Sequence, residues 1–300
     1  MDQGASILAK LKNKAKANGI SYQHCLQLFF QEEFLRRLAK SRYMENLVLK
    51  GGLFIYTLTN FESRATIDID FLIRNQDSSP NHMDQIIAEI IATPTGNNDI
   101  ILLEARESEQ ITPHRQYQGV STQIIGHIKN VRVPFNIDIG AGDVIVPAAE
   151  KRQVKTQLNE FEPPAVLTYS LESTIAEKLD AILQRFELTG RMKDFYDIYY
   201  LAQAFDFSGP LLQKALADAL QTRQTPHNEG SFARIFELKD DPEMKLKWRN
   251  FLKTIGDAEL SFDRVIDLIN QFLSPIYNAI IIDIIWQRTW NSKALIWQQT

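Results

Sequence analysis

The chain has 300 residues, of which 44% are hydrophobic, 10% aromatic and 23% charged. These fractions are typical of a folded globular protein, and the length is sufficient for two domains. The 33 basic and 37 acidic residues give a net charge of −4 with neutral histidine, which excludes a global positive field that would attract nucleic acid or an anionic membrane. A polyanionic partner would therefore need a local basic patch.

The single cysteine, Cys25, excludes an internal disulfide and a zinc site made of cysteines alone. It favours a reducing compartment, so we expect a cytoplasmic protein. Residues 1–16 mix lysines with isolated apolar residues and lack the apolar core of a secretory signal. No stretch reaches the roughly 18 to 20 apolar residues of a spanning helix, so we expect no membrane association.

The first half of the chain alternates predicted helices and strands. Apolar residues at helical spacing predict two opening helices between Ser6 and Lys40, separated near Gly19 and with Ser21 as the cap of the second. Strands are predicted over residues 46–50, 67–73, 100–107, 120–128 and 131–139, and helices over 53–58 and 84–92. The last three strands have the spacing of a meander that continues the sheet.

The second half is almost entirely helical in pattern. The polar residues 150–160 and the pair Pro163-Pro164 mark a boundary, which predicts domains over residues 1–162 and 163–300. Helices are predicted over residues 171–186, 193–204, 210–221, 242–255 and 262–273, followed by a final apolar helix over residues 276–286. The sequence thus predicts an α+β fold, with an α-helical second domain.

The pair Asp68 and Asp70 is the strongest chemical signal. Because alternate side chains of a strand share a face, these carboxylates are predicted on one face while Ile67 and Ile69 point into the core. Two adjacent carboxylates repel each other unless a cation neutralises them. If the strand of Asp138 lies beside theirs, three carboxylates converge, which suffices to hold two Mg²⁺ or Mn²⁺ ions for phosphoryl transfer.

The pair Gly51-Gly52 stands between a predicted strand and a predicted helix. The free N–H groups of such a turn can hold phosphate oxygens. Taken alone, an Asp-x-Asp pair is more often a surface feature, and a Gly-Gly pair more often an ordinary turn. Their order and spacing favour a site that binds a metal and a nucleotide.

A second group of polar residues lies on two predicted helices of the second half. Thr174 and Lys178 are four residues apart, and Asp194 and Asp197 three apart, so each pair shares a helix face. Lys178 is suited to bind a triphosphate, and Asp194 to hold Lys178 or to act as a base. The alternative, salt bridges that join two helices, is equally compatible with the residues.

Taken in order, several segments resemble the AbiEii/AbiGii toxin family of nucleotidyltransferases. They span residues 32–201 and read EEFLRRLAKSRYMENLVLKGGLFIYTL, RATIDIDFLI, FNIDIGAGD, LESTIAEKLDAILQR and RMKDFYDIYYL. The resemblance implies a polymerase-β-like nucleotidyltransferase domain with a mixed sheet flanked by helices, followed by an α-helical domain. It also implies a toxin with a cognate antitoxin, in toxin–antitoxin or phage-defence systems. The related MenT toxins transfer nucleotides to the 3′ ends of tRNA.

Carried over position by position, the resemblance implies a role for each matching residue. Asp68, Asp70 and Asp138 would bind the metal, and Lys178 and Asp194 would complete the catalytic set. The residues implied in nucleotide binding are Lys50, Gly51, Gly52, Arg64, Thr66, Lys178 and Lys193. Leu53 departs from the family pattern, since many members carry a serine or threonine in this turn.

These observations predict a Mg²⁺-dependent nucleotidyltransferase that moves a nucleoside monophosphate from an NTP to an acceptor hydroxyl and releases pyrophosphate. The expected acceptor is a tRNA 3′ end. The alternatives are NMP transfer to a protein hydroxyl and a non-catalytic nucleotide-binding or toxin–antitoxin interaction module. An RNA acceptor requires a local basic surface, for which there are two candidate groups. They are Arg36, Arg37, Lys40 and Arg42, and Lys151, Arg152 and Lys155.

Overall fold

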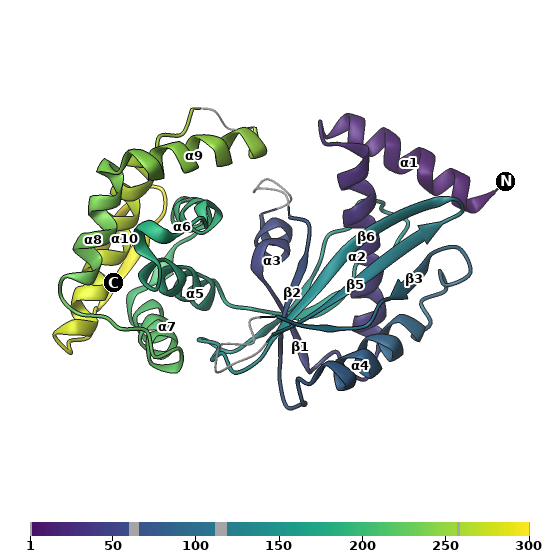
Figure 1. The fold of residues 1–300 in the computed structure, drawn as a ribbon, viewed down its shortest axis with the longest axis horizontal. Helices are drawn as coiled ribbons and strands as arrows, with labels where there is room; N and C mark the ends of the chain where they lie inside the picture. Colours follow the sequence, from purple (N-terminus) through teal and green to yellow (C-terminus); the bar gives the residue numbers. More distant parts are fainter. Residues whose placement is uncertain (1, 60–65, 112–118, 257–258, 300) are drawn as a thin grey trace. The chain divides into compact units, whose positions relative to one another are not determined.

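The computed structural model describes residues 2–59, 66–111, 119–256 and 259–299 (Figure 1). The chain divides into two units: unit 1 is Met1–Gly142 with Ala149–Tyr169, and unit 2 is Asp143–Ala148 with Ser170–Thr300. The sequence places the main boundary near Pro163, whereas in the structure residues 163–169 stay with unit 1. The reason is that strand β8 (Ala165–Thr168) pairs with β7 (Glu150–Gln153) and with β1 (Leu47–Lys50).

Unit 1 is built on a mixed sheet. Besides β1, β7 and β8, its strands are β2 (Ile69–Ile73), β3 (Leu102–Ala105), β4 (Glu109–Ile111), β5 (Gly119–Ile128) and β6 (Val131–Gly140). The strand order is β3-β5-β6-β2-β1-β8-β7, and β4 pairs with β5. Strands β2 and β6 run parallel, as do β1 and β8, and the other pairs are antiparallel. The predicted meander is confirmed, because β3, β5 and β6 are successive antiparallel neighbours.

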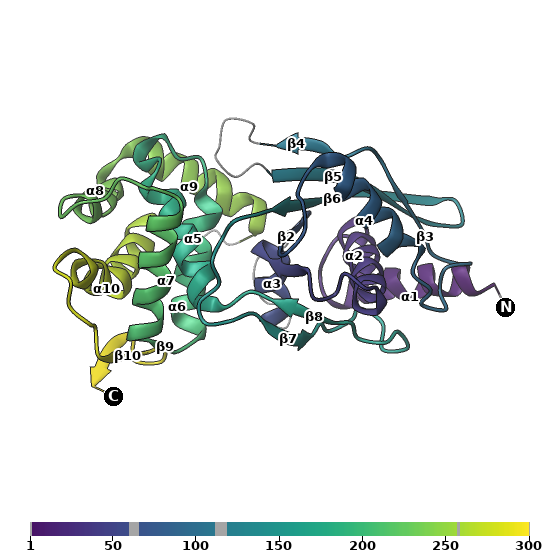
Figure 2. The same cartoon turned by 90° about the horizontal axis from the view of Figure 1, so that it is seen from below.

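The helices of unit 1 are α1 (Gln3–Ala17), α2 (Tyr22–Lys40), α3 (Gly51–Leu58) and α4 (Pro80–Ala92). The two predicted opening helices are confirmed, and Ser21 caps α2 by accepting a hydrogen bond from the His24 N–H. Helix α2 runs along the sheet and contacts β6, β8 and α4 (Figures 1 and 2). Fourteen of its 19 residues are buried, so α2 is a core helix.

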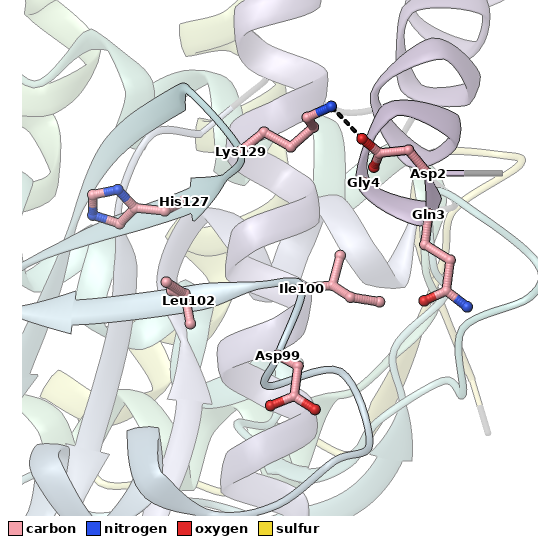
Figure 3. Close-up of a pocket in the computed structure, with 8 residues that line it drawn as sticks. All are labelled: Asp2, Gln3, Gly4, Asp99, Ile100, Leu102, His127 and Lys129. Carbon is pink, nitrogen blue, oxygen red and sulfur yellow. Dashed lines mark hydrogen bonds and ion pairs between the residues drawn. The ribbon is translucent and has the colours of Figure 1, made fainter.

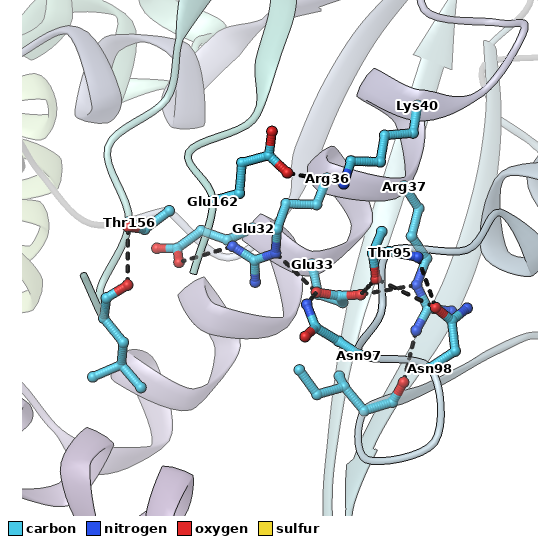
Figure 4. Close-up of polar contacts among 12 residues, drawn as sticks. Glu32, Glu33, Arg36, Arg37, Lys40, Thr95, Asn97, Asn98, Thr156 and Glu162 are labelled. Carbon is cyan, nitrogen blue, oxygen red and sulfur yellow. Dashed lines mark hydrogen bonds and ion pairs between the residues drawn. The ribbon is translucent and has the colours of Figure 1, made fainter. Parts of the chain in front are cut away.

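Two arginines of α2 lie inside unit 1. Glu33 accepts hydrogen bonds from Nε of Arg36 at 2.8 Å and Nε of Arg37 at 3.1 Å (Figure 4). The Arg37 guanidinium also donates to the carbonyls of Ile91 and Ile101, each at 2.6 Å. Each arginine is only 2% exposed. The prediction that Arg36 and Arg37 face an RNA is therefore wrong, because both side chains are buried: Arg37 fastens α2 to neighbouring segments, and Arg36 pairs with Glu33 of its own helix.

A second carboxylate of α2, Glu32, is also buried. It accepts the Gln157 backbone N–H through both oxygens, at 3.0 and 3.1 Å, and the nearest nitrogen of Arg36 is 3.9 Å away. Burial raises the pKa of Glu32 to about 8, although Arg36 and the Gln157 N–H oppose that rise. The Arg36 guanidinium lies over the rings of Phe161, at 5.0 Å, and Phe29, at 5.7 Å. This polar interior is thus held by hydrogen bonds and ring contacts together.

Unit 2 is mainly helical, as predicted. Its helices are α5 (Leu171–Leu183), α6 (Met192–Ala204), α7 (Gly209–Thr222), α8 (Ser231–Glu237), α9 (Pro242–Ile255) and α10 (Phe262–Ile281). Two 3-10 turns lie at Phe186–Leu188 and Leu238–Asp240. Helix α9 has the predicted bounds, and Asp241 caps it by accepting from the Glu243 and Met244 N–H groups. None of the helices in the described part of the chain combines the length and apolar character needed to cross a membrane.

The C-terminal segment differs from its prediction. The expected helix over residues 276–286 is instead the end of α10, which continues through Pro275 to Ile281. The chain then forms strands β10 (Arg288–Asn291) and β11 (Ile296–Gln299), which pair with each other, while β10 also pairs with β9 (Phe207–Ser208). Trp290 is fully buried against Phe272, and its Nε1 donates to the Ala202 carbonyl at 2.7 Å. The aromatic residues of this segment therefore complete the core of unit 2.

Candidate functional site

Four side chains form a row across the sheet of unit 1. Lys50 on β1 is the register partner of Asp70 on β2. On the other side of β2, Asp70 is the partner of Asp138 on β6, which in turn pairs with Ser121 on β5. Register partners project their side chains from the same face of a sheet, and all four are half-buried. We call Lys50, Asp70, Asp138 and Ser121 the sheet row.

The expectation that the strand of Asp138 lies beside that of Asp70 is confirmed by their parallel pairing. Ser121 was not anticipated, and its hydroxyl donates to Oδ1 of Asp138 at 2.6 Å. Nothing in the local sequence distinguishes Ser121 from other serines, because its place depends on the register of β5 against β6. At the other end of the row, Nζ of Lys50 lies 5.4 Å from the centre of the Tyr169 ring.

Gly51 brings the start of helix α3 directly against Asp70. Its φ is +70°, a conformation that residues other than glycine rarely adopt. A Cβ at this position would lie 2.0 Å from Oδ2 and 2.6 Å from Cγ of Asp70, so no side chain fits there. Lys50, the residue before α3, caps the helix with no side-chain hydrogen bond, and Gly52 occupies its first turn. The helix N-terminus therefore begins beside a carboxylate of the sheet row.

Asp68 lies in a bend just before β2 and is half-buried. The predicted strand began at Ile67, but β2 begins at Ile69, which is fully buried. The prediction that Ile67 points into the core is wrong: its side chain is 64% exposed, because the alternation of the strand does not extend to it. Thr66 is buried, and its hydroxyl donates to the Asp68 carbonyl at 3.4 Å. Arg64 lies outside the described residues.

The donor set of this region is chemically suited to a hard cation. Carboxylate oxygens are the preferred protein ligands of Mg²⁺ and Mn²⁺, and Asp70 and Asp138 project from adjacent strands. Across the ranges that the structure describes, no three His, Cys, Asp or Glu side chains stand together as a metal-binding group. A metal site formed by Asp68, Asp70 and Asp138 therefore stays a prediction.

In unit 2, the predicted lysine and aspartates meet in one buried group. Nζ of Lys178 on α5 lies 2.6 Å from Oδ2 of Asp197 and 3.1 Å from Oδ1 of Asp194, both on α6. Arg191 donates from Nε to Oδ2 of Asp194 at 2.5 Å. The two aspartate side chains are 1% exposed and that of Lys178 is 11% exposed. We call Lys178, Arg191, Asp194 and Asp197 the helix cluster.

The helix cluster is balanced in charge, with two cations and two carboxylates. Burial opposes the ionisation of Asp194, but Lys178 and Arg191 together hold the pKa of this carboxyl below its usual value. The ion pairs of Lys178 join α5 to α6, as the salt-bridge alternative expected, and a role of Lys178 or Asp194 in catalysis stays a prediction. Lys193, the neighbouring residue on α6, is exposed.

A second ion cluster in unit 2, not anticipated from the sequence, surrounds Arg223. Its NH2 nitrogen lies 2.9 Å from Asp143 and 3.1 Å from Glu177, and its NH1 nitrogen lies 3.2 Å from Asp180. Although burial opposes it, these three carboxylates raise the pKa of Arg223. Asp143 belongs to the segment FNIDIGAGD, so part of that motif serves to hold unit 2 together.

The remaining cations of the predicted basic surfaces differ in their ion pairs. Lys40 pairs with Glu162 at 2.8 Å, and Arg42 with Glu89 at 2.7 Å. Arg152 pairs with Glu150, while Lys151 and Lys155 are exposed. Lys40 and Arg42 are exposed as well, but a glutamate lies against each of them and offsets its charge.

A cavity of unit 1 lies apart from the sheet row, beside the N-terminus of α1 (Figure 3). Lys129 forms an ion pair with Asp2 at its edge. Its lining residues are Asp2, Gln3, Gly4, Asp99, Ile100, Leu102, His127 and Lys129. None of the residues predicted from the sequence to act in catalysis lines this cavity.

Comparison with known proteins identifies the family of this chain. The family model for nucleotidyl transferase AbiEii toxins of type IV toxin–antitoxin systems matches residues 33–268. Among solved structures, JHP933 from Helicobacter pylori is 14% identical, with a TM-score of 0.48 over 88% of this chain and 95% of that chain. A second structure from H. pylori, described as a nucleotidyltransferase, has the same identity and TM-score and covers 88% of this chain and 97% of that chain. No curated protein gives a significant match. Because the family model matches most of its length, the chain belongs to the AbiEii family of toxin nucleotidyltransferases.

Proposed function

We propose that this nucleotidyltransferase moves a nucleoside monophosphate from an NTP to an acceptor hydroxyl, with the sheet row and the start of α3 as its reaction centre. The observation that carries the proposal is the contact of Gly51 with Asp70 beside Asp138. It brings a helix N-terminus, which favours phosphate, next to two carboxylates, which favour a divalent cation.

The proposed ligands of Mg²⁺ are Asp68, Asp70 and Asp138. Bound there, Mg²⁺ would neutralise phosphate charge and favour ionisation of the acceptor hydroxyl. The Ser121 hydroxyl, by donating to Oδ1 of Asp138, orients that carboxylate and leaves its second oxygen for another partner. Lys50 supplies positive charge at the other end of the sheet row.

The start of α3 is proposed to hold the triphosphate. Backbone N–H groups of the first turn, at Gly51 and Gly52, would donate to phosphate oxygens, since the side chain of Lys50 at the N-cap does not cap them. Leu53 has no hydroxyl to offer a phosphate, and its side chain is buried. Arg64, Thr66 and Lys193 are proposed as further nucleotide contacts. Lys178 and Asp194 are proposed to act in transfer as a triphosphate-binding cation and its support.

The acceptor is proposed to be an RNA, with a tRNA 3′ end as the first to test, and the protein to act in the cytoplasm as a toxin controlled by an antitoxin, in phage defence. The family model's type IV toxin–antitoxin description supports the toxin role. The accessible cations Lys151 and Lys155 are the proposed contacts for the RNA backbone. Binding through phosphates predicts an affinity that falls as salt rises.

The test is an incubation of the full chain with each labelled NTP, Mg²⁺ and a whole-cell extract, followed by separation of RNA from protein. We expect label in the small-RNA fraction, and its loss on chelation of the metal. Asp70→Asn should reduce transfer at least about a thousandfold, since several kcal/mol of transition-state stabilisation depend on the metal. The matched control is Asp99→Asn, which changes an exposed aspartate of the same unit.

Other outcomes would point to the alternatives. Label in the protein fraction would replace the RNA acceptor by a protein hydroxyl. Metal-dependent NTP binding without any labelled product would indicate a nucleotide-binding module instead of an active transferase. Full activity in a folded Asp70→Asn variant would contradict the proposed reaction centre.

A further inference from the structure

Two buried glutamines of α2 contact the chain one residue before Asp68. Nε2 of Gln31 donates to the Ile67 carbonyl at 2.7 Å, and Nε2 of Gln27 donates to the same oxygen. Because they are four residues apart, the two side chains share one face of the helix. Gln31 is fully buried and Gln27 is 6% exposed. One backbone oxygen is therefore held by two side chains of a core helix.

The contact replaces what a sheet would otherwise supply. Ile67 precedes β2, so its carbonyl lies outside the ladder that begins at Ile69. Its side chain is 64% exposed and cannot fix the segment by packing into the core. A carbonyl that turns towards the interior needs hydrogen-bond donors, and here the two amides provide them. The position of Asp68, the next residue, thus depends on polar contacts from α2.

Gln31 is an unfavourable choice for packing alone. Its Oε1 is buried and has no hydrogen-bond partner in the part of the chain that the structure describes. Burying an unsatisfied amide oxygen costs stability, and an unbranched apolar side chain of similar size would avoid that cost. Its contribution is therefore the hydrogen bond that its amide nitrogen gives to Ile67.

We infer that Gln27 and Gln31 are positioning residues that set the place of Asp68 against the sheet row. The inference rests on the proposed function, because it assigns the glutamines to the same metal-binding carboxylates. Groups that orient metal ligands influence affinity even though they do not touch the metal. Both glutamines precede residue 33, where the match to the family model begins. The start of α2 would then act in the reaction centre through the Ile67 backbone.

The test measures binding of Mn²⁺ to the full chain by titration calorimetry, together with the Mn²⁺ dependence of NMP transfer. The main variant is Gln27→Met/Gln31→Met, which keeps side-chain size and removes both donors. We expect its Mn²⁺ affinity to fall about tenfold or more, and excess Mn²⁺ to restore much of the transfer. Each single variant keeps one donor and should show a smaller shift.

The matched control is Gln157→Met, which changes another buried amide of unit 1 that contacts Cys25 and Glu32 instead of Ile67. It should leave the Mn²⁺ affinity within twofold of the unchanged protein. Thermal unfolding of every variant reports any general loss of structure. Excess Mn²⁺ separates the two cases, because it would restore transfer lost through weaker metal binding but not transfer lost through a damaged fold.

An unchanged Mn²⁺ affinity in the folded double variant would overturn the inference. If the double variant does not fold, the two single variants decide: an affinity within twofold of the unchanged protein in both would overturn it equally. Failure of the proposed function has a different signature: either the unchanged protein would bind no Mn²⁺, or Asp70→Asn would leave its Mn²⁺ binding intact. In that case the inference falls with the function.

Discussion

The sheet row of unit 1 and the helix cluster of unit 2 each contain two aspartates and a lysine, but their surroundings differ. In the helix cluster, carboxylates and cations alternate, and both aspartate side chains are 1% exposed. In the sheet row, Asp70 and Asp138 are direct neighbours on parallel strands and are half-buried. The first arrangement neutralises its charges internally, whereas the second places like charges side by side.

This difference indicates that the helix cluster also serves the fold, whereas the sheet row serves the reaction. A buried, balanced ion cluster is compatible with a purely structural role, and removal of one member leaves another charge uncompensated. Adjacent carboxylates repel each other, and such a cost is typical of sites that bind a cation or a substrate. We therefore expect substitutions in the helix cluster to reduce stability as well as transfer, and those in the sheet row to affect mainly transfer.

The largest expected effect on stability is that of Lys178→Met. The variant leaves two buried carboxylates facing each other without their shared cation, and the free energy of unfolding should fall by about 3–5 kcal/mol. Chemical denaturation measures the loss. The control Lys214→Met removes an exposed partner of Asp218 and should cost less than about 1 kcal/mol. An equal, small loss in both would mean that the helix cluster does not stabilise unit 2 and would weaken the comparison.

Gly51→Ala should have the next largest effect. It should reduce the rate of transfer more strongly than it reduces the stability of the fold. The new Cβ would overlap the Asp70 carboxylate, in addition to the strain of a φ of +70°. A displaced Asp70 should reduce transfer about a hundredfold, while strain costs about 1–3 kcal/mol of unfolding free energy. The measurements are NMP transfer and thermal unfolding.

The chain offers a matched control for this variant. Gly19 has a φ of +66°, and a Cβ there would meet no atom within 4 Å, so Gly19→Ala introduces the strain without the overlap. It should leave transfer unchanged. If the two variants lost activity equally, the contact between Gly51 and Asp70 would have no part in the reaction.

The smallest effect is expected for Ser121→Ala. The variant removes the hydrogen bond to Asp138, which should cost about 1 kcal/mol of stability and about tenfold in transfer. The comparison is Ser108→Ala, whose hydroxyl lies 2.6 Å from that of Thr122 and not in the sheet row. An unchanged rate of transfer for Ser121→Ala would mean that only the charged residues of the sheet row take part in the reaction.

Much of the fold can be predicted from patterns along the chain. The apolar periodicity locates α9, and the alternation of residues 131–139 places Asp138 on a solvent-facing side of β6. Local patterns fail where a segment leaves regular structure. Ile67 belongs to an apparent strand, yet it precedes β2 and is exposed. The pattern of the C-terminal segment likewise hides the turn that separates α10 from β10.

By itself, the sequence determined the order of the longer elements up to β6, the mainly helical second half, and the presence of Gly51-Gly52, Asp68, Asp70 and Asp138 on elements that can meet. These features depend on local spacing, which is visible in one dimension. Only the tertiary structure decided that Arg36 and Arg37 are interior, that Ser121 bonds Asp138, and that two glutamines of α2 hold the Ile67 carbonyl. Burial and strand register arise from contacts between distant segments, and no local pattern specifies the partner of a charge.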